Sequence, residues 1–202
     1  MNCRYGFVVE FIPESVDCNL LAGRCIKTLH GFLSTNKIAA NSIGVAFPLW
    51  RNLSVGKAIA FVGPTEKELV GLSYQPYLSM MKEEGLFNVS SVKELPKHLP
   101  EVRFVRNQAI AKTFVASKRR RMSRAIERNG CNNYIPQASE EREFDFFHRI
   151  PIESKCSQQE FVLHVQKQDA LEVSVAGFNS YGLATNQRWQ GSVPNIDLTL
   201  FS

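Results

Sequence analysis

Residues 5–33 read YGFVVEFIPESVDCNLLAGRCIKTLHGFL, and within them the spacing of the apolar residues changes. Tyr5–Pro13 is rich in aromatic and β-branched residues, which predicts a strand. From Cys18 to Leu33 the apolar residues recur at helical spacing, and Asp17 is placed to cap that helix. A strand followed by an amphipathic helix therefore opens the fold.

The next segments extend this pattern. Further strands are predicted for Ser42–Trp50, Lys57–Gly63 and Leu86–Val92. Thr65 and Glu68 have the spacing of a capping box, which predicts a helix to about Glu84, broken or kinked at Pro76. The order β-α-β-β-α-β predicts an α+β protein whose residues 1–100 form a ferredoxin-like (RRM-type) domain. The aromatic signature of RRM proteins is missing, so we interpret this domain as a scaffold.

Residues 101–202 form a second predicted part with a different character. It starts with an extended arm at 101–110 and a basic helix at 111–128. A polar loop follows at 129–143. The small antiparallel sheet that we expect in 144–202 is built from Phe144–Ile152, Phe161–Val165 and Leu171–Leu183.

The positive charge of the chain is concentrated in one stretch. Residues 111–128, AKTFVASKRRRMSRAIER, hold seven basic residues and one acidic residue, although the chain's net charge is only +5. The remainder holds 17 basic and 18 acidic residues, so it is close to neutral. Such clustering is typical of proteins that bind a polyanion such as a nucleic acid.

At about 100° per residue, this stretch forms a helix with two different sides. One side is apolar, and we expect it to pack on the protein body: Ala111, Val115, Met122 and Ile126. The opposite side carries Arg120, Arg121, Arg124 and Arg128. The planar guanidinium suits bidentate contacts to phosphate and guanine, and an A-form groove is accessible at the end of a stem. We therefore favour an RNA hairpin as the ligand.

Two other interpretations of the basic helix stay open. A solvated surface helix usually mixes charges of both signs, whereas this one repels itself. A membrane-surface helix usually has Trp, Phe and Leu on its apolar side, and these are missing there.

Composition excludes several classes of protein. No apolar run approaches the ~20 residues that span a bilayer, and Met1–Glu10 has the composition of a strand rather than of a signal peptide. We therefore expect a soluble, cytoplasmic protein. The five cysteines form no C-x-x-C pair, which argues against a disulfide framework and a zinc site. We expect neither a metal nor a cofactor.

The chain resembles the CRISPR repeat-processing endoribonucleases of type I-F systems, the Csy-type family. Six stretches in order carry the resemblance: TLHGF (Thr28–Phe32), IGVAFP (Ile43–Pro48), FVRNQA (Phe104–Ala109), RRRMSR, SKCSQQEF (Ser154–Phe161) and SYGL (Ser180–Leu183). The chain departs from the family at Ala125, which interrupts the arginine run, and in a longer tail beyond Leu183.

The resemblance implies a metal-independent cut at the base of a repeat hairpin by attack of a ribose 2′-hydroxyl. It implies that His30 is the catalytic histidine, that Ser154 holds the reacting ribose, and that Tyr181 orients the histidine. Arg106 and Gln108 would read base edges, and Phe161 would stack on the terminal base pair. Arg120, Arg121 and Arg124 would be the arginines inserted into the groove. The charge of the helix predicts that Lys118, Arg119 and Arg128 bind RNA as well.

The residues alone leave simpler roles open. His30 could be an ordinary helix histidine, Ser154 a loop serine, and Tyr181 and Phe161 core aromatics. His98, His148 and His164 are interpreted as structural or exposed. At the level of function, the alternatives are a non-catalytic subunit that binds an RNA hairpin and a DNA-binding regulator.

The resemblance also implies partners. They are the repeat RNA hairpin, which the enzyme keeps as part of the guide RNA, and the backbone subunits of a type I-F surveillance complex. Some members of the family serve transposon-encoded complexes and contact a TniQ-family transposition protein. The TLHGF and IGVAFPLW stretches favour that version.

Overall fold

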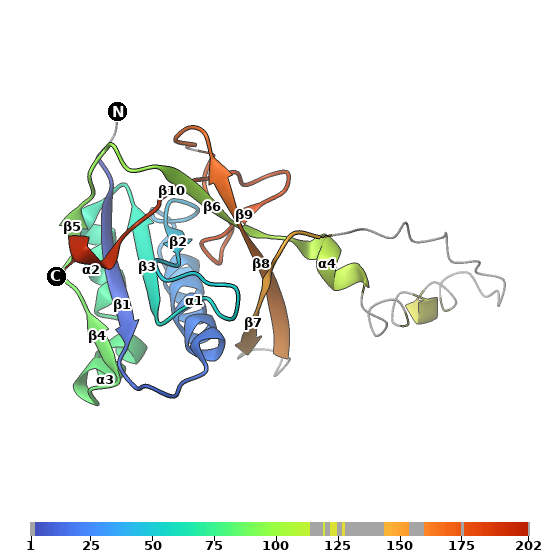
Figure 1. Ribbon diagram of the computed structural model, residues 1–202, viewed down its shortest axis with the longest axis horizontal. Coiled ribbons are helices and arrows are strands. Elements are labelled where there is room, and N and C mark those ends of the chain that lie inside the picture. The colour runs from blue at the N-terminus through green and yellow to red at the C-terminus, as the bar shows by residue number, and fades with distance from the viewer. Residues whose placement is uncertain are drawn as a thin grey trace.

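The computed structural model has the α+β class and the β-α-β-β-α-β order that the sequence predicts (Figure 1). It describes residues 3–113, 119, 122–124, 127, 144–153, 160–174 and 176–201. The elements of the N-terminal half are β1 (Tyr5–Phe11), α1 (Cys18–Thr35), β2 (Gly44–Ala46), β3 (Ala58–Gly63), α2 (Glu66–Ser73), α3 (Pro76–Glu83), β4 (Phe87–Val89) and β5 (Lys93–Glu94). The strands pair antiparallel in the order β2-β3-β1-β4, with β5 also on β1, which is the ferredoxin-like arrangement.

Local sequence explains where the helices of this half begin and end. Asp17 caps α1 as predicted, because its Oδ1 accepts a hydrogen bond from the Leu20 amide at 3.0 Å. α2 ends at Ser73 and α3 starts at Pro76, whose ring fits the first turn of a helix but not its interior. The predicted capping box is wrong, because Thr65 makes no side-chain capping bond. Acidic residues in the first turn of α2 favour this helix end electrostatically instead.

The C-terminal half adds a second sheet. Its elements are β6 (Glu101–Arg106), α4 (Gln108–Thr113), β7 (His148–Glu153), β8 (Glu160–Ala170), β9 (Ala184–Thr185), β10 (Val193–Pro194) and a short 3-10 helix, η1 (Leu198–Leu200). The order is β10-β6-β8-β7 with antiparallel pairs. The predicted antiparallel sheet is confirmed, and the two-residue strand β9 adds a parallel pair with β6.

The strand predicted at Leu171–Leu183 is also wrong. β8 continues to Ala170, and the described residues of 171–183 form turns and irregular backbone. Gly177 and Gly182 have φ angles of +72° and +71°, a left-handed conformation that reverses the chain. The alternating apolar residues therefore lie in a loop that returns to the sheet, and Leu171 is fully exposed.

The predicted arm is shorter than 101–110. Extended backbone ends at Arg106, and Asn107 then caps a helix, since its Oδ1 accepts a hydrogen bond from the Ala109 amide at 3.0 Å. Gln108 is therefore the first residue of α4 rather than part of a strand. α4 leaves the body of the protein at the end of β6 (Figure 1).

Helix α1 lies between the two sheets and fills the core. It packs on β3 of the first sheet and on β7 of the second, and Ala22, Cys25, Ile26 and Leu29 are completely buried. One hydrophobic cluster runs from the N-terminal sheet through α1 to the C-terminal sheet. The two halves thus share a core, and the division of the chain at residue 100 stays a prediction.

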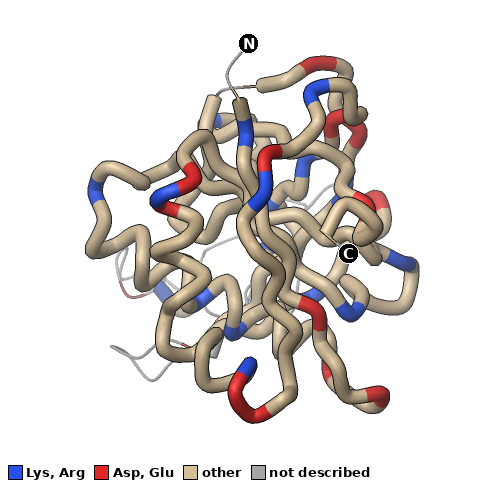
Figure 2. The backbone as a smooth tube through the Cα atoms, turned by 90° about the vertical axis from the view of Figure 1, so that its left-hand side faces the viewer, with Lys and Arg blue, Asp and Glu red and all other residues tan. Residues whose placement is uncertain are grey.

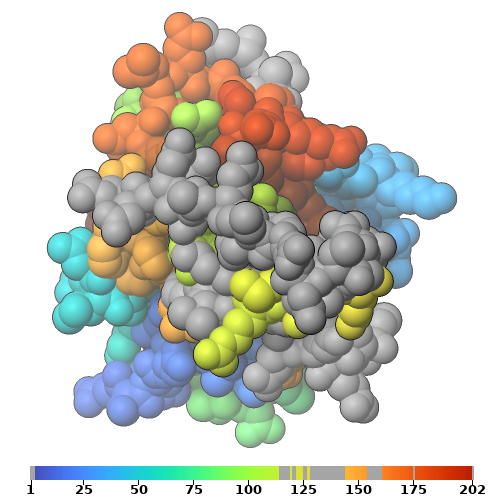
Figure 3. Space-filling model, turned by 90° about the vertical axis from the view of Figure 1, so that its right-hand side faces the viewer, coloured from blue at the N-terminus to red at the C-terminus, as the bar shows by residue number. Residues whose placement is uncertain are grey.

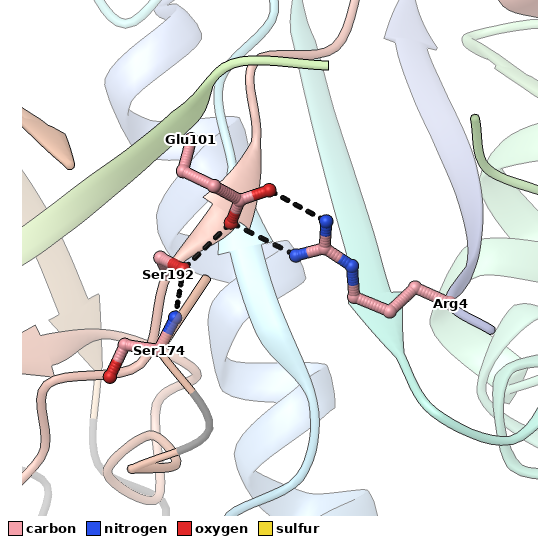
Figure 4. Close-up of polar contacts among 4 residues, drawn as sticks. All are labelled: Arg4, Glu101, Ser174 and Ser192. Carbon is pink, nitrogen blue, oxygen red and sulfur yellow. Dashed lines mark hydrogen bonds and ion pairs between the residues drawn. The ribbon is translucent and has the colours of Figure 1, made fainter. Parts of the chain in front are cut away.

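A buried ion pair also joins the two halves (Figure 4). Arg4 donates two hydrogen bonds to the Glu101 carboxylate, at 2.6 and 2.9 Å, and Glu101 is only 7% exposed. The Ser192 hydroxyl donates a third hydrogen bond to the same carboxylate at 2.7 Å and accepts one from the Ser174 amide at 2.8 Å. Glu101 is therefore both paired and hydrogen-bonded, which offsets the cost of burying its charge.

The face shown in Figure 2 carries basic and acidic residues interspersed with one another. This mixture contrasts with the excess of basic residues at 111–128. Among the helices of the described ranges, none combines the length and the apolar character that crossing a bilayer requires.

Substitution of Gly23 by Ala tests the contact between α1 and β7. A Cβ atom at Gly23 would overlap the carbonyl oxygen of Pro151, so one backbone would have to move. We expect the free energy of unfolding to fall by about 1–3 kcal/mol, as for other overpacked cores. Urea denaturation monitored by circular dichroism measures this change.

Gly31→Ala in the same helix is the matched control. A Cβ atom at Gly31 would have nothing within 4 Å, so the better helix propensity of alanine should stabilise the protein by roughly 0.5–1 kcal/mol. Equal effects of the two substitutions would contradict the close approach of α1 to β7.

Candidate functional site

Four side chains from four different elements meet at one end of α1. The rings of His30 and Tyr181 are stacked, with centroids 4.6 Å apart and planes inclined by 19°. The ring centroids of Phe161, in β8, and Tyr181 are 5.9 Å apart in a T-shaped arrangement, and the guanidinium carbon of Arg106 lies 5.3 Å from the centre of the Tyr181 ring. The structure thus brings together four of the residues that the sequence assigned to catalysis or RNA binding. All four are half-buried.

The hydrogen bond of His30 determines which nitrogen of its ring carries the proton. Nδ1 lies 3.0 Å from the backbone carbonyl oxygen of Ser180. A carbonyl can only accept a hydrogen bond, so Nδ1 must carry a proton. In the neutral imidazole Nε2 then has a free lone pair, and it can take a proton from a reacting group.

The turn that positions Ser180 and Tyr181 is held by Asn179. The Asn179 Oδ1 accepts hydrogen bonds from the amides of Tyr181, at 2.8 Å, and Leu183, at 3.2 Å. The backbone amide of Asn179 also donates to the Leu183 carbonyl at 2.9 Å. Asn179 is buried, so these bonds are protected from water. A small, closed turn therefore presents one carbonyl and one aromatic ring to His30.

Gly182 allows this turn to contact the core. Its φ of +71° disfavours any L side chain, and a Cβ atom there would stand 2.6 Å from Leu29 Cδ2 and 2.7 Å from Val45 Cγ2. The Gly182 carbonyl also accepts a hydrogen bond from the Val45 amide at 2.8 Å. The turn is thus tied to β2 and to α1, the helix that carries His30.

Arg106 places a positive charge beside the aromatic stack. Burial lowers the pKa of its guanidinium from the ordinary value, and the neighbouring Tyr181 partly opposes that change. Arginine nevertheless remains protonated in proteins. The site therefore combines a group that can transfer protons with a fixed cation that favours an anionic ligand such as a phosphate.

Asn179 and Ser180 belong to the candidate site but were not predicted from the sequence. Ser180 contributes a backbone carbonyl, which no residue type reveals. The signal that could have found the turn is an asparagine followed by glycine three positions later, because Asn side chains bond to nearby amides and Gly accepts positive φ.

The remaining predicted site residues lie either away from this cluster or outside the described residues. Gln108 is exposed at the start of α4, so it does not lie on the extended arm that was predicted to carry it together with Arg106. Ser154 lies outside the described residues. The same is true of four members of the basic helix: Lys118, Arg120, Arg121 and Arg128.

The described residues of the basic stretch are helical and exposed. Arg119, Met122, Ser123, Arg124 and Glu127 have helical backbone, and the Ser123 hydroxyl donates to the Arg119 carbonyl one turn earlier at 3.2 Å. They are drawn in yellow on the face shown in Figure 3. Met122 is 38% exposed, so the expectation that it packs on the protein body is wrong.

The other histidines are structural or exposed, as expected. His98 is exposed. His148 is buried, its Nε2 lies 2.6 Å from the Arg51 carbonyl, and its ring meets that of Trp50. His164 is buried and meets the ring of Phe147 edge-on.

Within the described ranges, no three His, Cys, Asp or Glu side chains are grouped so that they could hold a metal ion. The cysteines described there, Cys3, Cys18 and Cys25, are free thiols, and burial raises the pKa of Cys25 above its ordinary value.

Comparison with known proteins gives a family match over most of the chain. The family model described as CRISPR-associated protein (Cas_Csy4) matches residues 9–196. No curated protein matches. A solved structure described as "CRISPR associated protein Cas6" matches at 10% sequence identity and a TM-score of 0.35, over 96% of this chain and 99% of that chain.

The buried histidines predict how stability depends on pH. Burial lowers the pKa of His148, and burial together with Arg149 and Arg106 lowers that of His164. Both groups are thus harder to protonate in the folded state than in the unfolded state, where the pKa is about 6.5. Their contribution to stability is complete above this value and is lost as the pH falls below it.

NMR titration of the imidazole signals checks this directly, with His148→Gln to assign one of them. We expect both midpoints below 6.5 and a melting temperature that decreases from pH 7 to pH 5. Midpoints above 6.5 for both histidines would contradict the expected lowering of their pKa values.

Proposed function

Because the chain belongs to the Cas_Csy4 family of CRISPR-associated proteins, we propose that it is a metal-independent endoribonuclease that matures guide RNA. Its substrate is the repeat hairpin of the precursor, cut at the base of the stem. The observation that carries the proposal is the hydrogen bond from His30 Nδ1 to the Ser180 carbonyl. This bond leaves Nε2 as the proton acceptor, beside the guanidinium of Arg106.

The proposed reaction needs no group beyond the RNA and these side chains. His30 Nε2 takes the proton of the ribose 2′-hydroxyl at the cleavage position, and the oxygen attacks the adjacent phosphorus. The bond from phosphorus to the 5′-oxygen breaks, and that oxygen takes up the proton that His30 Nε2 received from the 2′-hydroxyl, so the imidazole returns to its neutral form. The products are a 2′,3′-cyclic phosphate and a 5′-hydroxyl. Tyr181 holds the imidazole plane by stacking, and Ser154 holds the ribose.

RNA recognition is divided between the cluster and the basic helix. Phe161, whose ring lies next to that of Tyr181, stacks on the terminal base pair, and Arg106 and Gln108 contact base edges. The arginine-rich helix enters the groove near the end of the stem, where an A-form groove is accessible. Its contacts involve Lys118, Arg119, Arg120, Arg121, Arg124 and Arg128.

The family match also supports a place in a larger particle. We infer that the protein keeps the cleaved hairpin and joins the backbone subunits of a type I-F surveillance complex. A version that serves RNA-guided transposition, with a TniQ-family partner, is favoured by the TLHGF and IGVAFPLW stretches alone.

The main alternative is a subunit that binds the hairpin without cutting it. His30→Ala separates the two functions. We expect cleavage to slow by about 10²–10⁴-fold, the usual contribution of a proton-transfer residue, while hairpin affinity changes little. The assay uses radiolabelled repeat RNA in EDTA, and the product ends are identified by phosphatase and kinase treatment.

His98→Ala is the matched control, because His98 is exposed. A second control is a substrate with a 2′-deoxyribose at the cleavage position, which the wild type should bind but not cut. Cleavage at the wild-type rate by His30→Ala would remove this residue from the mechanism. Loss of all activity in EDTA would contradict a metal-independent reaction.

Neutralisation of the basic helix tests RNA recognition. The triple variant Arg120→Gln, Arg121→Gln and Arg124→Gln should bind the hairpin more weakly. Log affinity falls as log salt rises, and each lost phosphate contact should make this slope shallower by roughly 0.7–0.9. Filter binding between 50 and 300 mM KCl, roughly the range in which such slopes are measured, gives both quantities.

The control for this triple variant removes the same charge elsewhere. Lys67, Lys82 and Lys97 are exposed in the ferredoxin-like half, and their combined replacement by Gln should leave the slope unchanged. Identical salt slopes for wild type and the arginine variant would show that the helix does not contact RNA phosphates.

A further inference from the structure

A polar pocket of about 430 Å³ lies on the C-terminal sheet, separate from the cluster around His30. Amide side chains dominate its lining, which consists of Arg103, Asn107, Phe144, Asp145, Gln166, Gln168, Thr185, Asn186 and Gln190. The function proposed above assigns no role to any of these residues.

Strand register places this pocket across the sheet from the candidate cleavage site. In the β6–β8 pair, Arg103 is opposite Gln168, and Arg106 is opposite Val165. Successive residues of a strand point to opposite faces, so Arg103 and Arg106, three positions apart, point to different sides. Arg106 shares its face with Phe104, which is buried in the core. The pocket is on the other face, at the end of β6 where the chain turns into α4.

The back wall of the pocket is a connected hydrogen-bond network. Asn186 donates to Asn107 Oδ1 at 3.3 Å, and Asn107 donates to Gln166 Oε1 at 2.9 Å. Gln166 in turn donates to the Asp145 carbonyl at 2.9 Å. Gln166 is only 3% exposed and Asn107 8%, so their amides are held in fixed orientations. The wall is therefore rigid before any ligand arrives.

Arg103 adds a donor that this network does not use. Its Nε is buried and has no hydrogen-bond partner among the described residues. Such atoms are rare in folded proteins, and each calls for an explanation such as a missing ligand or water. Gln168, which is half-buried, and Gln190, which is exposed, add amide groups to the same pocket.

The chemistry of the lining favours a nucleobase over a phosphate. The lining contains one cationic residue, Arg103, and one anionic residue, Asp145, so it offers little net attraction to an anion. Amides and a guanidinium match the donors and acceptors on base edges, and Phe144 offers a ring for stacking. Bases can be recognised in this way only when they are unpaired.

We propose that this pocket binds an unpaired base of the single strand that continues from the RNA hairpin. The inference rests on the proposed function, because it takes the hairpin to lie at His30 on the opposite face. Asn107 follows Arg106 directly in the chain, so a strand leaving the stem reaches the pocket by passing the end of β6. The pocket thus extends recognition from the stem to its flank.

Binding of matched RNAs to pocket variants tests the proposal. The RNAs are a bare hairpin, hairpins with a 5′ or a 3′ single-stranded flank, and flanked hairpins with abasic positions. All carry a 2′-deoxyribose at the cleavage position and are checked for integrity after binding. The test variant combines Gln168→Ala and Gln190→Ala, and the control is Gln187→Ala, an exposed glutamine outside the lining.

We expect the wild type to bind one of the flanked hairpins about tenfold more tightly than the bare hairpin. The double variant should lose this difference and keep its affinity for the bare hairpin, whereas Gln187→Ala should behave as wild type. An abasic flank should weaken binding by the wild type but not by the variant, which assigns the lost contact to a base. Arg103→Ala should reproduce the double variant.

Equal affinity of the wild type for flanked and bare hairpins would overturn the proposal. The proposal would also fail if the double variant bound the bare and the flanked hairpin more weakly by the same factor while its melting curve stayed unchanged. If the wild type binds no hairpin at all, the proposed function fails instead. The affinity for the flank oligonucleotide alone then tests the pocket. The wild type should bind this oligonucleotide more tightly than the double variant does, and equal affinities would overturn the pocket proposal.

Discussion

Helix α1 can approach β7 only because residue 23 has no side chain. This contact brings the helix backbone against the Pro151 carbonyl, and it closes the space between the two sheets. The helix then buries its apolar side on both the ferredoxin-like sheet and the second sheet. His30 is on this helix, and Phe161 and Arg106 are on the second sheet. The distance between the histidine and the residues around it therefore depends on how α1 is packed.

The turn at 179–183 provides the other half of this arrangement. Its bonds to Asn179 are buried, and Gly182 fits between Leu29 and Val45 with no space for a side chain. The carbonyl that selects the tautomer of His30 is thus held by the same core that holds the helix. This preorganisation favours proton transfer, because little rearrangement is needed when a substrate binds.

Local rules predicted the elements whose signals are contained in a few residues. Asp17 marks the start of α1, and Pro76 marks the start of α3. The order of strands and helices in the first half follows from such local signals taken one after another. The strand expected at Leu171–Leu183 failed because two positive φ angles override the alternation of apolar residues. Four site residues could be assigned through a family resemblance, whereas the Ser180 carbonyl depends on tertiary structure and on no side chain.

The buried pair of Arg4 and Glu101 has a consequence for biosynthesis. The carboxylate receives its last hydrogen bond from Ser192, 91 residues later in the chain. During translation the first sheet can form early, but Glu101 must stay in water until Ser192 has been made, because burying it half-paired would be costly. Contacts this distant in sequence close late and slowly. A nascent chain should therefore expose the seam between its halves until Ser192 is available, and chaperones that bind such surfaces have time to act there.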